Sequence, residues 1–368
     1  MPLRRLFNSL KNFDWVLFGA TFLLICFGLA GIYSITISSE NPDFLNFKKQ
    51  IIAALIGLLL LFLIGFFDYR LWQDYSYLLY IAVALVLVAV LFLGQTIRGT
   101  TGWFSILGFN FQPVELAKIA LIIFSAWFLN KQANLIKEFK IFILSATAFG
   151  LFFLLIILQP DFGSGLILFF VWLVMIIFAG ANKKHLALLG LSLLILFVLA
   201  WVFLFQNYQR DRILTFFDPQ ADPYGRGYHV RQALTAVGAG GFLGRGLGFG
   251  SQSQLKFIPA SQTDFIFAVI AEELGFLGIG LVFFLWGVIF YRLIKAAKMM
   301  RDNFPLLVIL GISALFFSQI IINIGMNLGL VPVTGIALPF LSYGGSFLLI
   351  SLMAIGIVES MVIRNQTS

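Results

Sequence analysis

The fold is decided by residues 140–180, which read KIFILSATAFGLFFLLIILQPDFGSGLILFFVWLVMIIFAG. Apart from the opening lysine, Asp161 is the only charged side chain in this stretch. A helix needs about 20 apolar residues to cross the roughly 30 Å hydrocarbon layer of a bilayer, and the stretch holds two such runs. Pro160 lies between them and would break a continuous helix. The stretch therefore predicts two membrane-spanning helices joined by a tight turn at 159–162.

Apolar residues dominate the rest of the chain in the same way. Of its 368 residues, 61% are hydrophobic and 11% are charged, and the mean hydropathy is +1.00. Soluble domains carry about 25% charged residues, so the composition excludes a water-soluble enzyme and a disordered chain. The single cysteine excludes an intramolecular disulfide framework. With two histidines in addition, a His/Cys metal cluster is not expected.

Ten apolar segments are long enough to cross a bilayer. We predict an all-α integral membrane protein with about ten transmembrane helices, at roughly 14–35, 48–67, 75–94, 113–129, 140–158, 163–180, 186–205, 265–290, 305–328 and 338–363. The chain is expected to form a single transmembrane domain over 1–368. Its one large loop, about 206–264, connects the seventh span to the eighth.

The distribution of lysine and arginine predicts the orientation, because cytoplasmic loops carry an excess of these residues. With the N-terminus in the cytoplasm, three basic residues lie in short outer loops, namely Lys48, Lys49 and Arg98. Fourteen lie on the inner side: Arg4, Arg5, Lys11, Arg70, Lys131, Lys137, Lys140, Lys183, Lys184, Arg292, Lys295, Lys298, Arg301 and Arg364. Both termini are therefore predicted to be cytoplasmic, and the loop 206–264 extracytoplasmic.

The strongest candidate for chemistry is Asp264, at the junction between the large loop and the eighth span. Small residues follow it at Ala268, Ala271, Gly275 and Gly278, on nearly one face of a helix. Small residues in membrane helices face other helices, so Asp264 should point into a protein-lined cavity, where a carboxylate is a functional candidate. The alternative is a carboxylate that only interacts with free backbone N–H groups at the helix start.

Other ionisable side chains lie in or beside the spans. Glu115 and Lys118, three residues apart, should meet at the start of the fourth span. Either the two charges only neutralise each other, or the lysine contacts a phosphate. The role of Asp161, in the outer turn, is open in the same way. Glu272 and Glu273, two turns into the eighth span, point about 100° apart. We interpret both as structural hydrogen-bonding groups between helices.

The large loop combines cations with a glycine-rich run at 238–250. Arginine binds phosphate through two parallel N–H hydrogen bonds. Attraction to lipid headgroups explains the presence of these cations equally well. The glycine run has no GxGxxG spacing, which excludes a dinucleotide fingerprint. It is either a flexible loop or a backbone surface pressed against a bulky headgroup. The cations are Arg210, Arg212, Arg226, Arg231, Arg245 and Lys256.

These groups fit the transfer of a sugar from a lipid diphosphate in the outer leaflet. The leaving group needs counter-charge and the acceptor hydroxyl needs a general base, so one carboxylate with several cations suffices. A hydrolytic glycosidase needs two opposed carboxylates. A transporter would place its ionisable groups at mid-membrane on broken helices, and a structural scaffold would tolerate replacement of Asp264.

Five motifs occur in order along the chain: QPVELAK at 112–118, QPD at 159–161, RDRI at 210–213, TDFIFAVIAEELG at 263–275 and LPFLSYGGS at 338–346. Together they resemble the SEDS family (shape, elongation, division and sporulation), whose members RodA and FtsW are ten-span peptidoglycan glycosyltransferases. The resemblance covers essentially the whole chain. It implies polymerisation of lipid II and release of undecaprenyl diphosphate at the outer face of the bacterial cytoplasmic membrane.

The resemblance also implies roles for individual residues and partners. Asp264 is expected to be the catalytic residue. The resemblance assigns functional positions to Lys118, Glu115 and Asp161, which are expected to contact the diphosphate or headgroup. The same contacts are expected, independently of it, from Arg210, Arg212, Arg245, Lys256 and Ser342. A divalent cation, Mg²⁺ or Mn²⁺, could bridge the diphosphate and carboxylates, but no ligand spacing marks a site and no other cofactor is expected. The expected partner is a class B penicillin-binding protein, the transpeptidase, with other elongation-complex proteins; nucleic acid is not expected.

Finer features favour one branch of the family. The run GSQSQL at 250–255 and the short N-terminus favour a RodA-like role in cell elongation and rod shape. A division-specific FtsW-like polymerase is the alternative, and a lipid-precursor flippase without catalysis is the alternative from another class. The chain departs from the family pattern at Phe347, where a second serine is usual, and in the loop before Trp103, which lacks a second arginine.

Overall fold

The computed structural model describes residues 10–37, 42–97, 99–106, 109–199, 203 and 226–365. Each of the ten predicted spans contains a helix, as expected where a bilayer offers the backbone no hydrogen-bond partner outside the chain. The helices are α2 (Trp15–Ile37), α3 (Leu45–Phe66), α5 (Ser76–Leu93), α6 (Pro113–Lys131), α7 (Phe139–Ile157), α8 (Phe162–Phe178), α9 (Lys183–Leu199), α13 (Ile266–Met299), α14 (Asn303–Asn327) and α15 (Gly345–Asn365). Eight are long and apolar enough to cross a membrane; α8 and α9 have 17 residues each.

The predicted turn at 159–162 is confirmed. α7 ends at Ile157 and α8 begins at Phe162, so the two spans form a hairpin. Asp161 is the N-cap of α8, and its side chain accepts a hydrogen bond from the backbone N–H of Ser164 at 3.0 Å. The proline and the capping carboxylate together explain why one long apolar run becomes two helices.

Short elements connect the spans, and several of them have no signal in the local sequence. Between α5 and α6 the chain forms an antiparallel sheet in the order β1-β2-β3. The predicted loop 206–264 contains a 15-residue helix, α11, which packs against α13. The short elements are α4 (Arg70–Asp74), β1 (Gln95–Ile97), β2 (Thr100–Ile106), β3 (Phe109–Phe111), η1 (Ala133–Leu135), α11 (Arg226–Gly240) and α12 (Ser251–Gln254).

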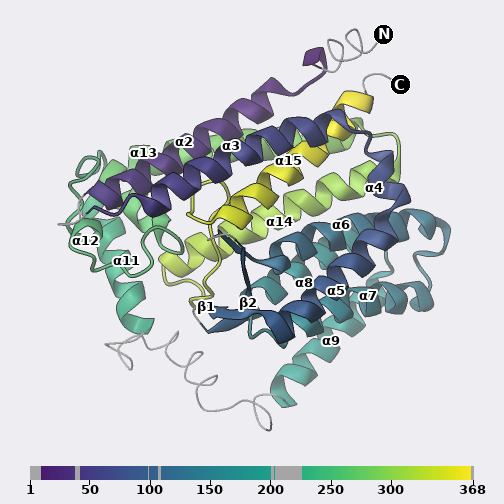
Figure 1. The fold of residues 1–368 in the computed structure, drawn as a ribbon. Helices are drawn as coiled ribbons and strands as arrows, with labels where there is room; N and C mark the ends of the chain where they lie inside the picture. Colours follow the sequence, from purple (N-terminus) through teal and green to yellow (C-terminus); the bar gives the residue numbers. More distant parts are fainter. Residues whose placement is uncertain are drawn as a thin grey trace.

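Close helix packing builds the core. α15 lies along α3, and α14 packs against α6 and α8 (Figure 1). Glycines allow the closest approaches: a Cβ on Gly356 of α15 would lie 2.8 Å from the carbonyl oxygen of Leu61 in α3. α15 begins at Gly345, seven residues later than the predicted span, because 338–344 forms a turn that packs beside the start of α13.

Charged side chains join the helices at one end of the bundle. The carboxylate of Asp14 lies 2.6 Å from Nε of Arg292 in α13, and the Asp14 backbone N–H donates to Glu359 of α15 at 3.0 Å. Arg364 donates to the last carbonyls of α3, on Gly65 and Phe66. The beginning of α2 and the end of α15 therefore lie at the same end, as an even number of spans requires.

The orientation of this end remains a prediction, and thiol labelling tests it. In a Cys26→Ala background, Lys256→Cys should react with a membrane-impermeant maleimide in intact cells, because the loop 206–264 is predicted to face outward. The matched control is Lys298→Cys near the other end of α13, which should react only after lysis. Both lysines are exposed, so accessibility depends on the side of the membrane alone. The reverse pattern would contradict the predicted orientation.

Candidate functional site

Polar side chains connect the beginnings of helices α6, α8 and α15. The side-chain amide of Gln112, the N-cap of α6, donates to Asp161 Oδ2 at 3.2 Å, and its backbone N–H donates to Ser346 Oγ at 3.3 Å. Ser346, in the first turn of α15, donates in turn to the carbonyl of Asn110 in β3 at 2.7 Å. Three of the five motifs, 112–118, 159–161 and 338–346, therefore meet at one end of the bundle.

The turn 338–344 extends this network to the segment that carries Asp264. Ser342 Oγ donates to the carbonyl of Thr263 at 2.6 Å and accepts the N–H of Leu338 at 2.8 Å. The N–H of Tyr343 donates to the carbonyl of Gln262 at 2.8 Å. Ser342 is 1% exposed, so its hydroxyl serves to join the two segments, and a direct contact with substrate would require these bonds to break.

Two buried asparagines in α14 fix the backbone at Asp264. Asn323 and Asn327, both fully buried, each donate a side-chain N–H to the Asp264 carbonyl oxygen at 3.0 Å. Asn323 also donates to the carbonyl of Ile336 at 2.7 Å, and Asn327 Oδ1 accepts the N–H of Ala268 at 3.3 Å. Two amides four residues apart inside an apolar run are the signal that could have identified these residues from the sequence.

Asp264 itself lies two residues before the start of α13 and is half-buried. The predicted row of small residues below it holds only in part, because the helical conformation of α13 is interrupted at Gly275, where φ is 64° and ψ is −161°. Gly278 therefore does not continue the face of Ala268 and Ala271. These two alanines are buried, and Ala268 packs in the cluster that contains Ala233 of α11.

The predicted pair at the start of α6 is confirmed. Lys118 Nζ lies 2.7 Å from Glu115 Oε1, and the side chains are 3% and 9% exposed. The i,i+3 spacing on a helix that begins at Pro113 produces this contact. A buried pair of this kind makes both charges tolerable in an apolar helix. Both residues lie in the first two turns of α6, which is the end of the helix where Gln112 contacts Asp161.

The structure places two of the loop cations that are expected to contact the diphosphate, Arg245 and Lys256. Arg245 is exposed and donates to the carbonyl of Ala239 at 3.3 Å and to Ser251 Oγ at 3.0 Å. Lys256 is exposed, with a positive φ of 57°. Arg210 and Arg212 lie outside the described residues. Contacts of these four side chains with a diphosphate therefore stay predictions.

Among the described residues, no three His, Cys, Asp or Glu side chains form a group that could hold a metal ion. A Mg²⁺ or Mn²⁺ that bridges the diphosphate and a carboxylate, a common arrangement for Mg²⁺ in proteins, stays a hypothesis.

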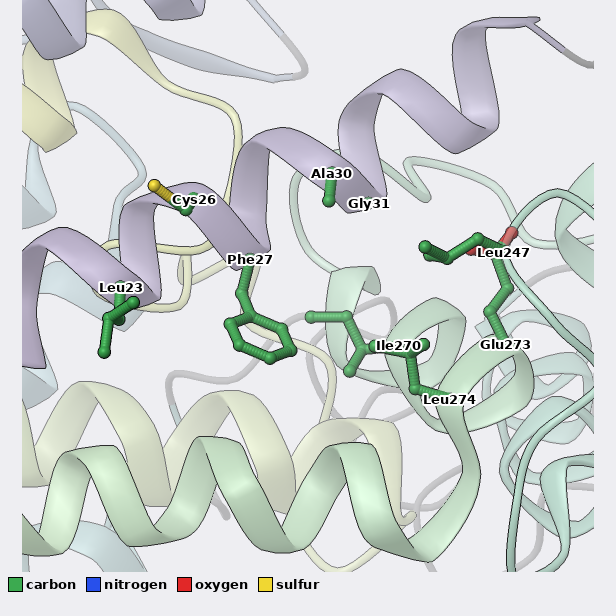
Figure 2. Close-up of a pocket in the computed structure, with 9 residues that line it drawn as sticks. All are labelled: Leu23, Cys26, Phe27, Ala30, Gly31, Leu247, Ile270, Glu273 and Leu274. Carbon is green, nitrogen blue, oxygen red and sulfur yellow. The ribbon is translucent and has the colours of Figure 1, made fainter.

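An apolar cavity of about 260 Å³ opens between α2 and α13 (Figure 2). Leu23, Cys26 and Phe27 line it from α2, Ile270 and Leu274 from α13, and Leu247 from the glycine-rich run. Among the described residues, Glu273 is the one charged residue of its lining, and Asp264 is not part of it. The cavity is therefore separate from the polar network described above.

Comparisons with known proteins cover nearly the whole chain. Residues 14–367 match the FtsW/RodA/SpoVE family model, described as cell cycle protein. The stage V sporulation protein E of Bacillus subtilis is 40% identical, over 94% of this chain and 95% of that protein. A protein of Geobacter sp. (strain M18) named "Probable peptidoglycan glycosyltransferase FtsW" is 34% identical, over 97% and 98%.

Solved structures agree with the sequence matches. A chain from "Structural coordination of polymerization and crosslinking by a peptidoglycan synthase complex" is 32% identical with a TM-score of 0.82, over 97% of this chain and 99% of that one. The rod shape determining protein RodA of Thermus thermophilus is 29% identical with a TM-score of 0.71, over 97% and 98%.

Proposed function

This chain belongs to the FtsW/RodA/SpoVE family of cell cycle proteins and is a multi-pass membrane peptidoglycan glycosyltransferase, and from that premise we propose that it polymerises lipid II at the outer face of the cytoplasmic membrane. The whole chain, 1–368, would act as one catalytic domain. The observation that carries the proposal is the fixed position of Asp264, whose carbonyl oxygen two buried amides hold at 3.0 Å.

In the proposed reaction, the 4-hydroxyl oxygen of the acceptor GlcNAc attacks the anomeric carbon of the lipid-linked donor sugar. A new C–O bond forms while the bond from that carbon to the diphosphate oxygen breaks, and undecaprenyl diphosphate leaves. The Asp264 carboxylate takes the hydroxyl proton as the general base. Positive side chains such as Lys118, Arg210, Arg212, Arg245 and Lys256 would stabilise the diphosphate charge.

Incubation of the purified protein with fluorescent lipid II tests the proposal against its two rivals. Glycan chains should form, because only an enzyme makes the glycosidic bond. Translocation of lipid II across vesicles without chain formation would favour a flippase. The absence of both activities would favour a scaffold for another synthase.

The buried ion pair at the start of α6 yields a further prediction. Lys118→Met leaves Glu115 charged and unpaired, so we expect a loss of about 3–5 kcal/mol in the free energy of unfolding together with lower turnover. The double change Glu115→Gln with Lys118→Met removes both charges and should restore thermal stability without restoring polymerisation, because the cation is still missing. Polymerase activity recovered in the double variant would contradict a phosphate-binding role for Lys118.

The biological role is proposed as RodA-like elongation, supported by the GSQSQL run at 250–255. The relatives reported above carry sporulation, division and rod-shape names, so cell shape is the discriminating measurement. Depletion in the native cell should turn rods into spheres; filaments would instead favour division. We also propose a class B penicillin-binding protein as the partner, because a related chain belongs to a complex that coordinates polymerization and crosslinking.

A further inference from the structure

The glycine-rich run is inserted into the break in α13. Near Gly275, where α13 departs from helical geometry, four backbone groups of α13 form hydrogen bonds with the glycine-rich run. The four hydrogen bonds are Arg245 N–H to the Glu272 carbonyl (3.0 Å), Gly246 N–H to the Glu273 carbonyl (2.9 Å), Phe276 N–H to the Gly241 carbonyl (2.9 Å) and Leu277 N–H to the Phe242 carbonyl (3.1 Å). The run thus lies against a helix backbone, which is what its glycines permit.

The side chains of Glu272 and Glu273 hold the next piece of chain, the short helix α12. Glu272 accepts the backbone N–H groups of Gln252 at 2.8 Å and Ser253 at 2.9 Å. Glu273 accepts the hydroxyl of Ser34 in α2 at 2.6 Å, the side-chain amide of Gln254 at 3.1 Å and the backbone N–H of Gly248. The two glutamates are at most 1% exposed. The structural interpretation of both is therefore confirmed.

This anchoring closes a loop that contains Asp264. The chain leaves α12 at Leu255, returns through Asp264 and enters α13 at Ile266. We call residues 255–265 the return segment. Its last residue continues directly into α13. Its first residue follows α12, which Glu272 attaches to α13 about two turns further along that helix. Within the segment, Ile258 and Phe265 belong to the buried cluster that includes Ala233 and Ala236 of α11, so the segment is packed both before and after Asp264.

We propose that Glu272 is a positioning residue for Asp264. Its carboxylate accepts hydrogen bonds from two backbone N–H groups of α12, and it thereby fixes the return segment and the position of the catalytic aspartate. This inference rests on the proposed role of Asp264 as the base. Gln252 and Ser253 present backbone donors, which cannot rotate to suit a new partner. Glu273 has one backbone donor, Gly248, which lies outside α12, and two side-chain donors, Ser34 and Gln254, which can reorient. The two neighbouring glutamates therefore provide a matched comparison.

Glu272→Gln tests the proposal, with Glu273→Gln as the control. The glutamine has one acceptor oxygen, and its NH₂ group faces a backbone donor. We expect kcat for lipid II polymerisation to fall at least about 10-fold while KM changes less than about 2-fold, since small misplacements of a catalytic group reduce the chemical step. Glu273→Gln should stay within about 3-fold of wild type, because two of its three donors are side chains that can reorient and it binds no backbone N–H of α12.

A double variant separates positioning from general stability. Glu272→Gln added to Asp264→Asn should cause no further loss of residual polymerisation, because residues that act as a unit are non-additive. A further loss of about 10-fold, or full activity of the single variant, would overturn the proposal. Should Glu272→Gln not fold, Gln252→Pro removes one of the two donors and should give the same loss of kcat. A wild-type protein that makes no glycan would instead overturn the proposed function itself.

Discussion

Asp264→Asn is expected to reduce glycan polymerisation by at least about 10²-fold, the lower end for loss of a general base. Asparagine has nearly the shape of aspartate and keeps hydrogen-bonding atoms, but its amide does not take up the acceptor proton. The comparison is between purified variant and wild type at equal protein, with chain formation from fluorescent lipid II as the measurement.

The structure predicts that this variant folds. Asn323 and Asn327 hold the Asp264 backbone carbonyl, which the substitution does not alter. Thermal unfolding and lipid II binding should therefore match wild type, so that the loss lies in the chemical step. Activity near that of wild type would eliminate Asp264 as the base and direct attention to Asp161 or Glu115.

Gly240→Ala is expected to disrupt the packing of α11 on α13 and, with it, polymerisation. A Cβ on Gly240, at the end of α11, would lie 1.9 Å from the carbonyl oxygen of Ala271 in α13. The obstacle is backbone, which cannot rotate away, so α11 must move off α13. Overpacking of this kind costs about 1–3 kcal/mol and at times more, a large part of a total stability of about 5–15 kcal/mol. We expect a lower unfolding temperature and loss of polymerisation.

Gly238→Ala is the matched control for this substitution. Gly238 lies in the same helix and is exposed, and a Cβ added there would meet no atom of the described residues within 4 Å, the nearby backbone of its own helix aside. Alanine at this position should leave activity intact and add about 0.5–1 kcal/mol of stability, because glycine is unfavourable within a helix. Equal behaviour of the two alanine variants would show that α11 and α13 do not pack as described.

Features that depend on neighbouring residues can be predicted from the sequence. The spans follow from the lengths of apolar runs, because each helix satisfies its own backbone in a bilayer. The turn before α8 follows from Pro160, and the contact between Glu115 and Lys118 follows from their i,i+3 spacing. The physical causes of these features all act within a few residues.

Features that depend on distant segments cannot be predicted in this way. The sequence alone leaves the glycine-rich run as a flexible loop or a surface for a headgroup, yet its backbone partners lie in α13, about 30 residues later. For the same reason nothing near Gly275 marks the break in α13. The hydrogen bonds from Asn323 and Asn327 to Asp264 also join segments some 60 residues apart.

The tie between the two ends of the chain has a consequence for biogenesis. Asp14 contacts Arg292 and Glu359, up to 345 positions further along, and α3 packs along α15. At about 5–20 residues per second of synthesis, the first two spans wait on the order of tens of seconds in the membrane before these partners emerge. Asp14 must meanwhile be accommodated by water, lipid headgroups or an assisting factor, so the early helices should be the segment most in need of protection during insertion.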